Sequence, residues 1–121
     1  MNNNYSEIEK EITEHLQLKR YKLALITSKK FVESFPEDPN AQVLYAISLL
    51  ENLNPFLALD TINYAVELSS NSPEIRLERA FILYRLSIYD GALIDCNFYL
   101  SNREKNDIRA LTLKANILSA S

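Results

Sequence analysis

Apolar residues recur along this chain at helical spacing, in segments that prolines and polar runs separate. Near the start, Ile8, Ile12 and Leu16 follow one another at intervals of four residues, so they lie on one face of a helix. Ser6, followed three residues later by Glu9, has the pattern of a capping box. We therefore expect the first helix to begin at Ser6.

The later helices are marked by the residues that open them. Asp38-Pro39, Asn54-Pro55 and Ser72-Pro73 each combine a side chain that can cap a helix with a proline that suits its first turn. The stretch that follows Pro73 is apolar on nearly all sides, which is typical of a helix with several neighbours. The predicted helices run over about residues 6–16, 21–34, 41–52, 55–68, 73–86, 90–100 and 107–120.

The helical pattern repeats with a period of 34 residues. A shift of that length superimposes small and turn-forming residues: Ala24 with Ala58 and Ala92, Ala46 with Ala80, and Pro39 with Pro73. A fixed period in this range indicates a stack of similar supersecondary units rather than a single irregular core.

These residues resemble the tetratricopeptide repeat family, and the resemblance covers essentially residues 5–121. In that family a small residue of the first helix meets an alanine of the second where the two helices cross. Ala46 with Ala58 and Ala80 with Ala92 follow this rule, whereas Ile12 stands opposite Ala24. The turn glycine of the family is replaced by Lys19, Leu53 and Ser87.

The resemblance implies an all-α fold, an α-solenoid of helix-turn-helix units in one domain. After a disordered lead at residues 1–4, the units are expected at about 5–38, 39–72 and 73–106, with a closing helix at 107–120. The closing helix matches the earlier first helices with a shift of 35, because Leu77–Leu83 aligns with Thr112–Leu118.

Composition and charge narrow the function classes. One glycine and 47% apolar residues fit a helical protein better than a sandwich or barrel. The net charge of −3 gives no electrostatic case for nucleic acid, and the single cysteine gives none for a disulfide framework. No run of 18 apolar residues is present, so we expect a cytoplasmic location; a domain trimmed from a membrane-anchored or exported protein is the alternative.

Candidate chemistry is sparse, and we predict no catalytic residue, metal site or cofactor. His15 has no second histidine, cysteine or serine at a spacing typical of catalysis, so it is interpreted as a packing or surface residue. Cys96 lies among Ile94 and Phe98, which favours a buried, inert thiol over a regulatory one. Phosphate-loop and nucleophile motifs are missing, so the chain is not expected to be an enzyme.

The resemblance places the first helix of each unit on a concave groove that binds a peptide or helix of a partner protein, and the residues of this chain predict an apolar groove. The groove residues expected from the second unit are Asn40, Val43, Ile47 and Leu50, and those from the third are Leu77, Phe81, Tyr84 and Arg85. A clamp for a free carboxylate is not expected. Family members with such a clamp need Lys, Arg and Asn at certain positions of the groove. At or beside these positions, this chain has Glu9, Thr13, Leu44, Glu74 and Glu78.

We therefore expect a non-enzymatic adaptor or scaffold, with two alternatives. One is a small chaperone resembling those of bacterial secretion systems, and the other is a module for self-association. A second interface is predicted on the last helix, where Leu111, Ala115 and Leu118 occupy the face that a further helix would cover. That face is expected to be covered by another copy, by a partner or by further residues.

Overall fold

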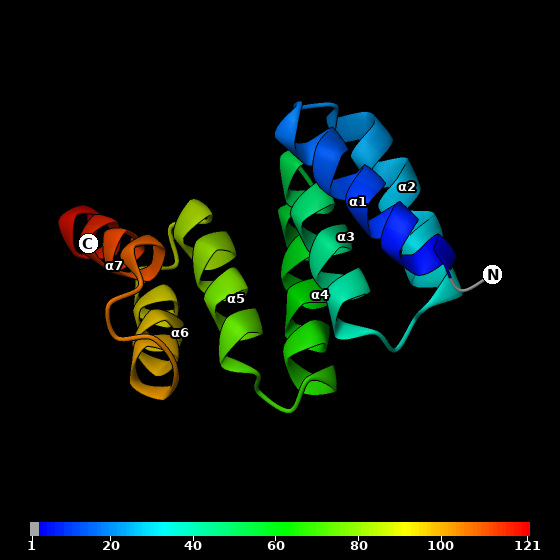
Figure 1. Ribbon diagram of the computed structural model, residues 1–121. Coiled ribbons are helices and arrows are strands. Elements are labelled where there is room, and N and C mark those ends of the chain that lie inside the picture. The colour runs from blue at the N-terminus through cyan, green and yellow to red at the C-terminus, as the bar shows by residue number, and fades with distance from the viewer. Residues whose placement is uncertain (1–2) are drawn as a thin grey trace. The chain divides into compact units, whose positions relative to one another are not determined.

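The computed structural model describes residues 3–121, which fold into seven α-helices without a strand (Figure 1). The sequence predicted seven helices, and their type and order are confirmed. The helices are α1 (Asn3–Gln17), α2 (Tyr21–Ser34), α3 (Pro39–Glu51), α4 (Pro55–Leu68), α5 (Pro73–Arg85), α6 (Tyr89–Asn102) and α7 (Ile108–Ala120).

The start of α1 differs from the predicted one. The helix begins at Asn3, so Ser6 lies inside it and cannot be its N-cap. Of the predicted lead at residues 1–4, Asn3 and Asn4 belong to α1, and residues 1 and 2 lie outside the described part of the chain. The capping-box prediction was wrong because the sequence pattern does not distinguish the first turn of a helix from its second.

Two of the later helices begin with a capping aspartate. Asp38 accepts a hydrogen bond from the backbone N–H of Ala41 at 3.2 Å, and Pro39 occupies the first turn of α3. Asp107 does the same for α7 through Ala110, also at 3.2 Å. The cap predicted at Asp38 is therefore confirmed. Ser72 differs, because its hydroxyl bonds the side chain of Glu74 instead of capping α5.

Three turns repeat the same backbone geometry at intervals of 34 residues. Lys19, Leu53 and Ser87 have φ angles of 61°, 64° and 62°, in the left-handed region that glycine normally occupies. After α3, Leu53 N–H bonds the carbonyl of Leu50, and Asn54 N–H bonds that of Leu49. This pair of bonds is a Schellman motif. The repeat therefore keeps the glycine geometry of its turns without the glycine.

The helices form two compact units, the first ending at Leu68 and the second running from Ser69 to Ser121. In the first unit, α1 lies against α2 and α3, and α3 pairs with α4. Its core includes Ile12, Phe31 and Ala41, each fully buried, with partly buried apolar side chains around them. The alanines at the predicted crossings, Ala46 and Ala58, are also fully buried.

In the second unit, α5 and α6 pair closely, and α7 lies against both. Ala80 and Ala92, the second predicted crossing pair, are fully buried. From α7, Ala110, Leu113 and Ile117 enter the core of this unit. The unit also encloses one carboxylate, that of Asp95, whose partners are arginines of α5.

Candidate functional site

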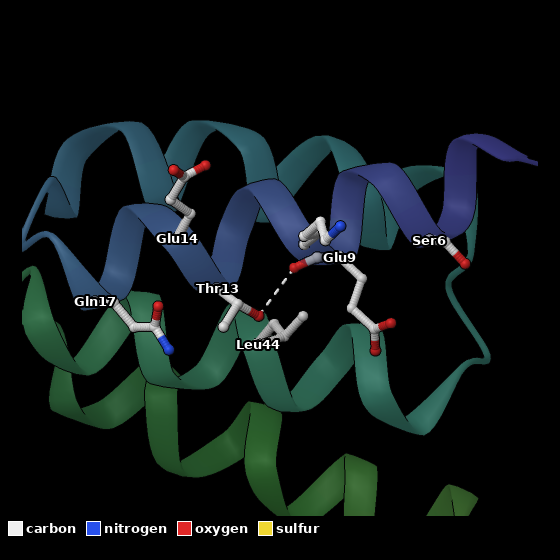
Figure 2. Close-up of a pocket in the computed structure, with 7 residues that line it drawn as sticks. Ser6, Glu9, Thr13, Glu14, Gln17 and Leu44 are labelled. Carbon is white, nitrogen blue, oxygen red and sulfur yellow. Dashed lines mark hydrogen bonds between the residues drawn. The ribbon is translucent and has the colours of Figure 1, made fainter.

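A pocket of about 750 Å³ lies between α1 and α3 of the first unit (Figure 2). Six of its lining residues come from α1 and one from α3: Ser6, Glu9, Lys10, Thr13, Glu14, Gln17 and Leu44. The α1 positions recur at three- and four-residue intervals, which places them on one side of the helix. The pocket is therefore a groove with a polar α1 wall and an apolar contribution from α3.

The N-terminal end of α1 is held over α3 by Tyr5. Its hydroxyl donates a short hydrogen bond to Asp38, the residue that caps α3. The ring of Tyr5 lies 4.9 Å from that of Phe31 and 5.2 Å from that of Phe35, measured between centroids. The Tyr5 side chain thus anchors α1 both by an apolar contact and by a hydrogen bond. Glu9 follows Tyr5 one helical turn later.

The charges of Asp38 and Glu9 act on the hydroxyl of Tyr5. Burial, the hydrogen bond to Asp38 and the charges of Asp38 and Glu9 together raise the pKa of Tyr5 from 10.0 to about 12. Burial is the largest of these causes, and the two carboxylates act in the same direction because they oppose a second negative charge beside them. The hydroxyl therefore stays protonated and keeps its role as a donor to Asp38.

The side chains of α1 differ in direction. Figure 2 shows Glu9 and Gln17 directed from α1 toward α3, Leu44 opposite Thr13, and Glu14 pointing away from α3. The hydroxyl of Thr13 donates to the backbone carbonyl of Glu9 at 2.9 Å, so its proton is used within the helix. Toward the groove, Thr13 can only accept hydrogen bonds.

Four residues of α3 were predicted to form the groove: Asn40, Val43, Ile47 and Leu50. None of them is among the seven residues that line this pocket. Val43 and Leu50 are 8% exposed, so they contribute mostly to the core. Ile47 is half-buried and Asn40 is exposed. The residue of α3 that does line the pocket is Leu44, one position beyond Val43.

The predicted groove residues of α5 belong to the second unit and differ in exposure. Leu77 is only 3% exposed, Phe81 and Tyr84 are half-buried, and Arg85 is exposed. The guanidinium of Arg109, from α7, lies 4.6 Å from the centre of the Phe81 ring, at a distance typical of a cation–π contact. Part of the Phe81 surface is thus covered by the chain itself.

Two ion pairs run along the same side of α5. Arg109 donates to Glu78 at 3.0 Å, and Arg103 donates to Glu74 at 2.6 Å. The hydrogen bond from Arg103 is the main reason that the pKa of Glu74 is lowered. This side of α5 is therefore more polar than the apolar wall that the sequence suggested.

Sequence reasoning overlooked most of the polar wall of α1. A shift of 34 residues carries Asn40 onto Ser6, Val43 onto Glu9 and Ile47 onto Thr13, and all three of these α1 residues line the pocket. The sequence had singled out Glu9 and Thr13 only as residues that do not fit a carboxylate clamp, and the same shift applied to the predicted groove positions would have identified all three as lining residues. Lys10, Glu14 and Gln17 lie beside these positions, and no pattern in the sequence marked them as lining residues.

Other reactive groups take no part in the pocket. The Cys96 thiol is fully buried, and burial is the main reason that its pKa is raised. On α1, the ring of His15 contacts Glu11 at 3.3 Å and does not line the pocket. Residues 3–121 contain no group of three His, Cys, Asp or Glu side chains that could hold a metal ion.

The last helix exposes one apolar side. Leu111 and Leu118 are 42% and 54% exposed, and Ala115 is exposed between them. The opposite side of α7, with Leu113 and Ile117, is buried in the second unit. The face that the sequence predicted as a second interface is thus at the surface of this chain.

Among the helices described, none has both the length and the apolar character needed to cross a membrane. Neither a protein-family model nor a curated protein sequence matches the chain.

Solved structures match over nearly the whole chain. The first TPR domain of Spaghetti (RPAP3), bound to the HSP90 peptide SRMEEVD, is similar with a TM-score of 0.81 at 18% identity, covering 96% of this chain and 94% of that one. The TPR2B domain of yeast Sti1, in a complex with pHsp70, has a TM-score of 0.79 at 16% identity, covering 97% and 98%. The Yersinia enterocolitica secretion chaperone SycD, with a peptide of the translocator YopD, has a TM-score of 0.73 at 12% identity, covering 98% and 89%.

Proposed function

We propose, from the tetratricopeptide repeat fold of this chain, that it is a non-enzymatic adaptor whose first unit binds a segment of a partner protein between α1 and α3. The observation that carries this proposal is the groove of about 750 Å³ between these helices. Solved domains of the same fold are described with bound peptides, which supports a peptide as the type of ligand. We place the adaptor in the cytoplasm, where a free thiol such as Cys96 is usual.

The composition of the groove supports a peptide as its ligand. Leu44 offers an apolar contact from α3, while Glu9, Thr13 and Gln17 offer hydrogen-bonding groups from α1. A partner segment can therefore bury an apolar side chain and pair its polar groups in one place, as grooves that bind helices or extended peptides do.

The predicted groove positions Asn40 and Ile47 on α3 remain part of this proposal as further contacts. Phe81, Tyr84 and Arg85 on α5 are proposed as a contact surface of the second unit by itself. Their surface is exposed or half-buried, so a ligand can reach it. Val43 and Leu50 are buried in the core of the first unit, and Leu77 is buried in that of the second.

Site-specific photocrosslinking tests the location of the site. Replacing Thr13, which lines the pocket, by benzoylphenylalanine should give a defined adduct in an extract of the native host, identified by mass spectrometry. The same replacement at Lys29, an exposed residue of α2 outside the pocket, is the control and should give no such adduct. Equal crosslinking at both positions, or none at Thr13, would argue against the proposed site.

A second candidate function is that of a chaperone for an exported protein, which the similarity to SycD favours. The crosslinking experiment separates the two. An exported protein as the main adduct would identify a chaperone, whereas a resident component of a larger assembly would identify an adaptor.

A further inference from the structure

We infer that the pocket between α1 and α3 selects a partner segment that carries a lysine or arginine side chain, with Glu9 as its main contact. This inference rests on the proposed function, because it names the chemistry of the ligand at the same site. Glu9 is half-buried and points from α1 toward α3 (Figure 2). A cation from a partner can therefore reach its carboxylate inside the groove.

Glu9, Thr13, Glu14 and Gln17 present hydrogen-bond acceptors to the pocket. The hydroxyl proton of Thr13 is already donated to the carbonyl of Glu9, so the oxygen presents only lone pairs. The carboxylates of Glu9 and Glu14 are acceptors, and the amide of Gln17 can accept as well as donate. Ammonium and guanidinium groups are pure donors, so they complement this set better than a carboxylate does.

The carboxylate of Glu9 has no cation of its own. Within residues 3–121, ion pairs join other acidic residues to arginines, as Glu74 is joined to Arg103 and Glu78 to Arg109, but neither Glu9 nor Glu14 takes part in one. The field of Glu9 reaches Tyr5, where it helps to raise the pKa of the hydroxyl. A cation of the partner protein could therefore pair with the Glu9 carboxylate without first displacing another cation from it.

Lys10 also lines the pocket, and it is the single cation among the seven lining residues. Two carboxylates against one ammonium leave the lining net negative. An acidic peptide such as SRMEEVD, which the RPAP3 domain binds, would therefore meet repulsion here. Since the pocket is open to solvent, we expect a modest preference that salt weakens.

Two blocked heptapeptides test this inference with the full chain. One alternates leucine with lysine, and the other has glutamate in place of lysine. Titrations followed by backbone amide NMR shifts should show saturable changes for the lysine peptide at residues 6–17 and Leu44. Glu9→Gln should weaken its binding about three- to tenfold, Glu14→Gln less so, and about 0.5 M salt should reduce the effect of both substitutions.

Glu7→Gln is the matched control, because Glu7 is an exposed carboxylate of the same helix that does not line the pocket. It should leave the affinity unchanged, and thermal melting should show that all three variants fold. Equal or tighter binding of the glutamate peptide at these residues would overturn the charge preference but support the site. Failure of both peptides to shift residues 6–17 would overturn this inference, while the crosslinking at Thr13 tests the proposed function by itself.

Discussion

Arg79 of α5 and Asp95 of α6 are joined by two parallel hydrogen bonds, from Nε to Oδ2 at 2.6 Å and from Nη2 to Oδ1 at 2.9 Å. Arg76 adds a third bond to Oδ1 at 2.9 Å, and its guanidinium lies 3.8 Å from the centre of the Phe98 ring. The Asp95 side chain is only 2% exposed. A polar cluster thus holds α5 and α6 together where helix packing is usually apolar.

Replacing Asp95 by alanine should destabilise the chain strongly. Two mostly buried guanidinium groups would lose their counter-charge, and breaking such a pair typically costs about 3 kcal/mol or more. Urea denaturation of the variant measures the loss. Asp90→Ala, at an exposed position of the same helix, should cost less than about 1 kcal/mol. If both variants lose a similar amount of free energy of unfolding, the Asp95 cluster contributes no more to stability than an exposed residue does.

The turn at Leu53 is predicted to gain stability from glycine. Leu53 has a φ of 64° and its side chain is 87% exposed, so the left-handed backbone has a cost and no buried contact offsets it. Leu53→Gly should be more stable than Leu53→Ala by about 1 kcal/mol, because both remove the side chain but only glycine removes the Cβ strain. Thermal and urea melts decide this. If the two variants are equally stable, the turn does not hold Leu53 in this conformation.

The sequence predicts those features of the fold that depend on single residues and on their spacing along the chain. The turns at Lys19, Leu53 and Ser87 and the buried alanines follow from the 34-residue period, since each depends on one position and its equivalent in the next unit. The resemblance to a known fold supplied the pairing of helices. Solved structures of the same type confirm that architecture.

The Asp95 cluster and the pocket were not predictable in the same way. Asp95 lies next to Cys96, so a helical pattern places it near the core without showing that arginines on α5 neutralise its charge. Phe81 was expected only as a groove residue, because the sequence does not show that Arg109 of α7 lies over its ring. Such contacts join residues far apart in sequence, and only the folded backbone brings them together.

A pH-dependent contribution is expected from Tyr99 and Asp107. The hydroxyl of Tyr99 donates to Asp107 at 2.6 Å, and this bond is the main reason that the pKa of Asp107 is lowered from 3.8. A carboxylate with a lowered pKa contributes stability that is present above its unfolded value and is lost as the pH falls through the folded one. This contribution is therefore complete at neutral pH and disappears on acidification below 3.8.

Tyr99→Phe tests this contribution. Without the donor, the pKa of Asp107 in the folded state should return toward 3.8, so the variant should be less stable than the wild type at neutral pH. The difference in free energy of unfolding should shrink at the lowest pH at which both still fold, because Asp107 is then protonated in both. Tyr89→Phe is the control, since its hydroxyl bonds Ser87 and no carboxylate. A difference for Tyr99→Phe that is independent of pH would contradict this assignment.

The two sides of α7 should respond differently to lysine. Leu111 and Leu118 are exposed, so the double variant Leu111→Lys with Leu118→Lys should melt within a few degrees of the wild type. Leu113 is 3% exposed, and Leu113→Lys should unfold the second unit or lower its stability strongly, because an unpaired charge would be buried. Melting temperatures of the two variants compare the two sides of the helix directly.

Sedimentation velocity then tests whether the exposed side of α7 is an interface. We expect the wild type to associate at high concentration and the double lysine variant to stay monomeric, because two ammonium groups on each copy would prevent apolar contact across this face. Glu104→Lys, at an exposed position just before the helix, changes the net charge by the same number of units and should leave association intact. A wild type that is monomeric at every concentration excludes self-association through α7. If the double variant also loses several degrees of stability, the stripe of Leu111 and Leu118 belongs to the core of the folded chain.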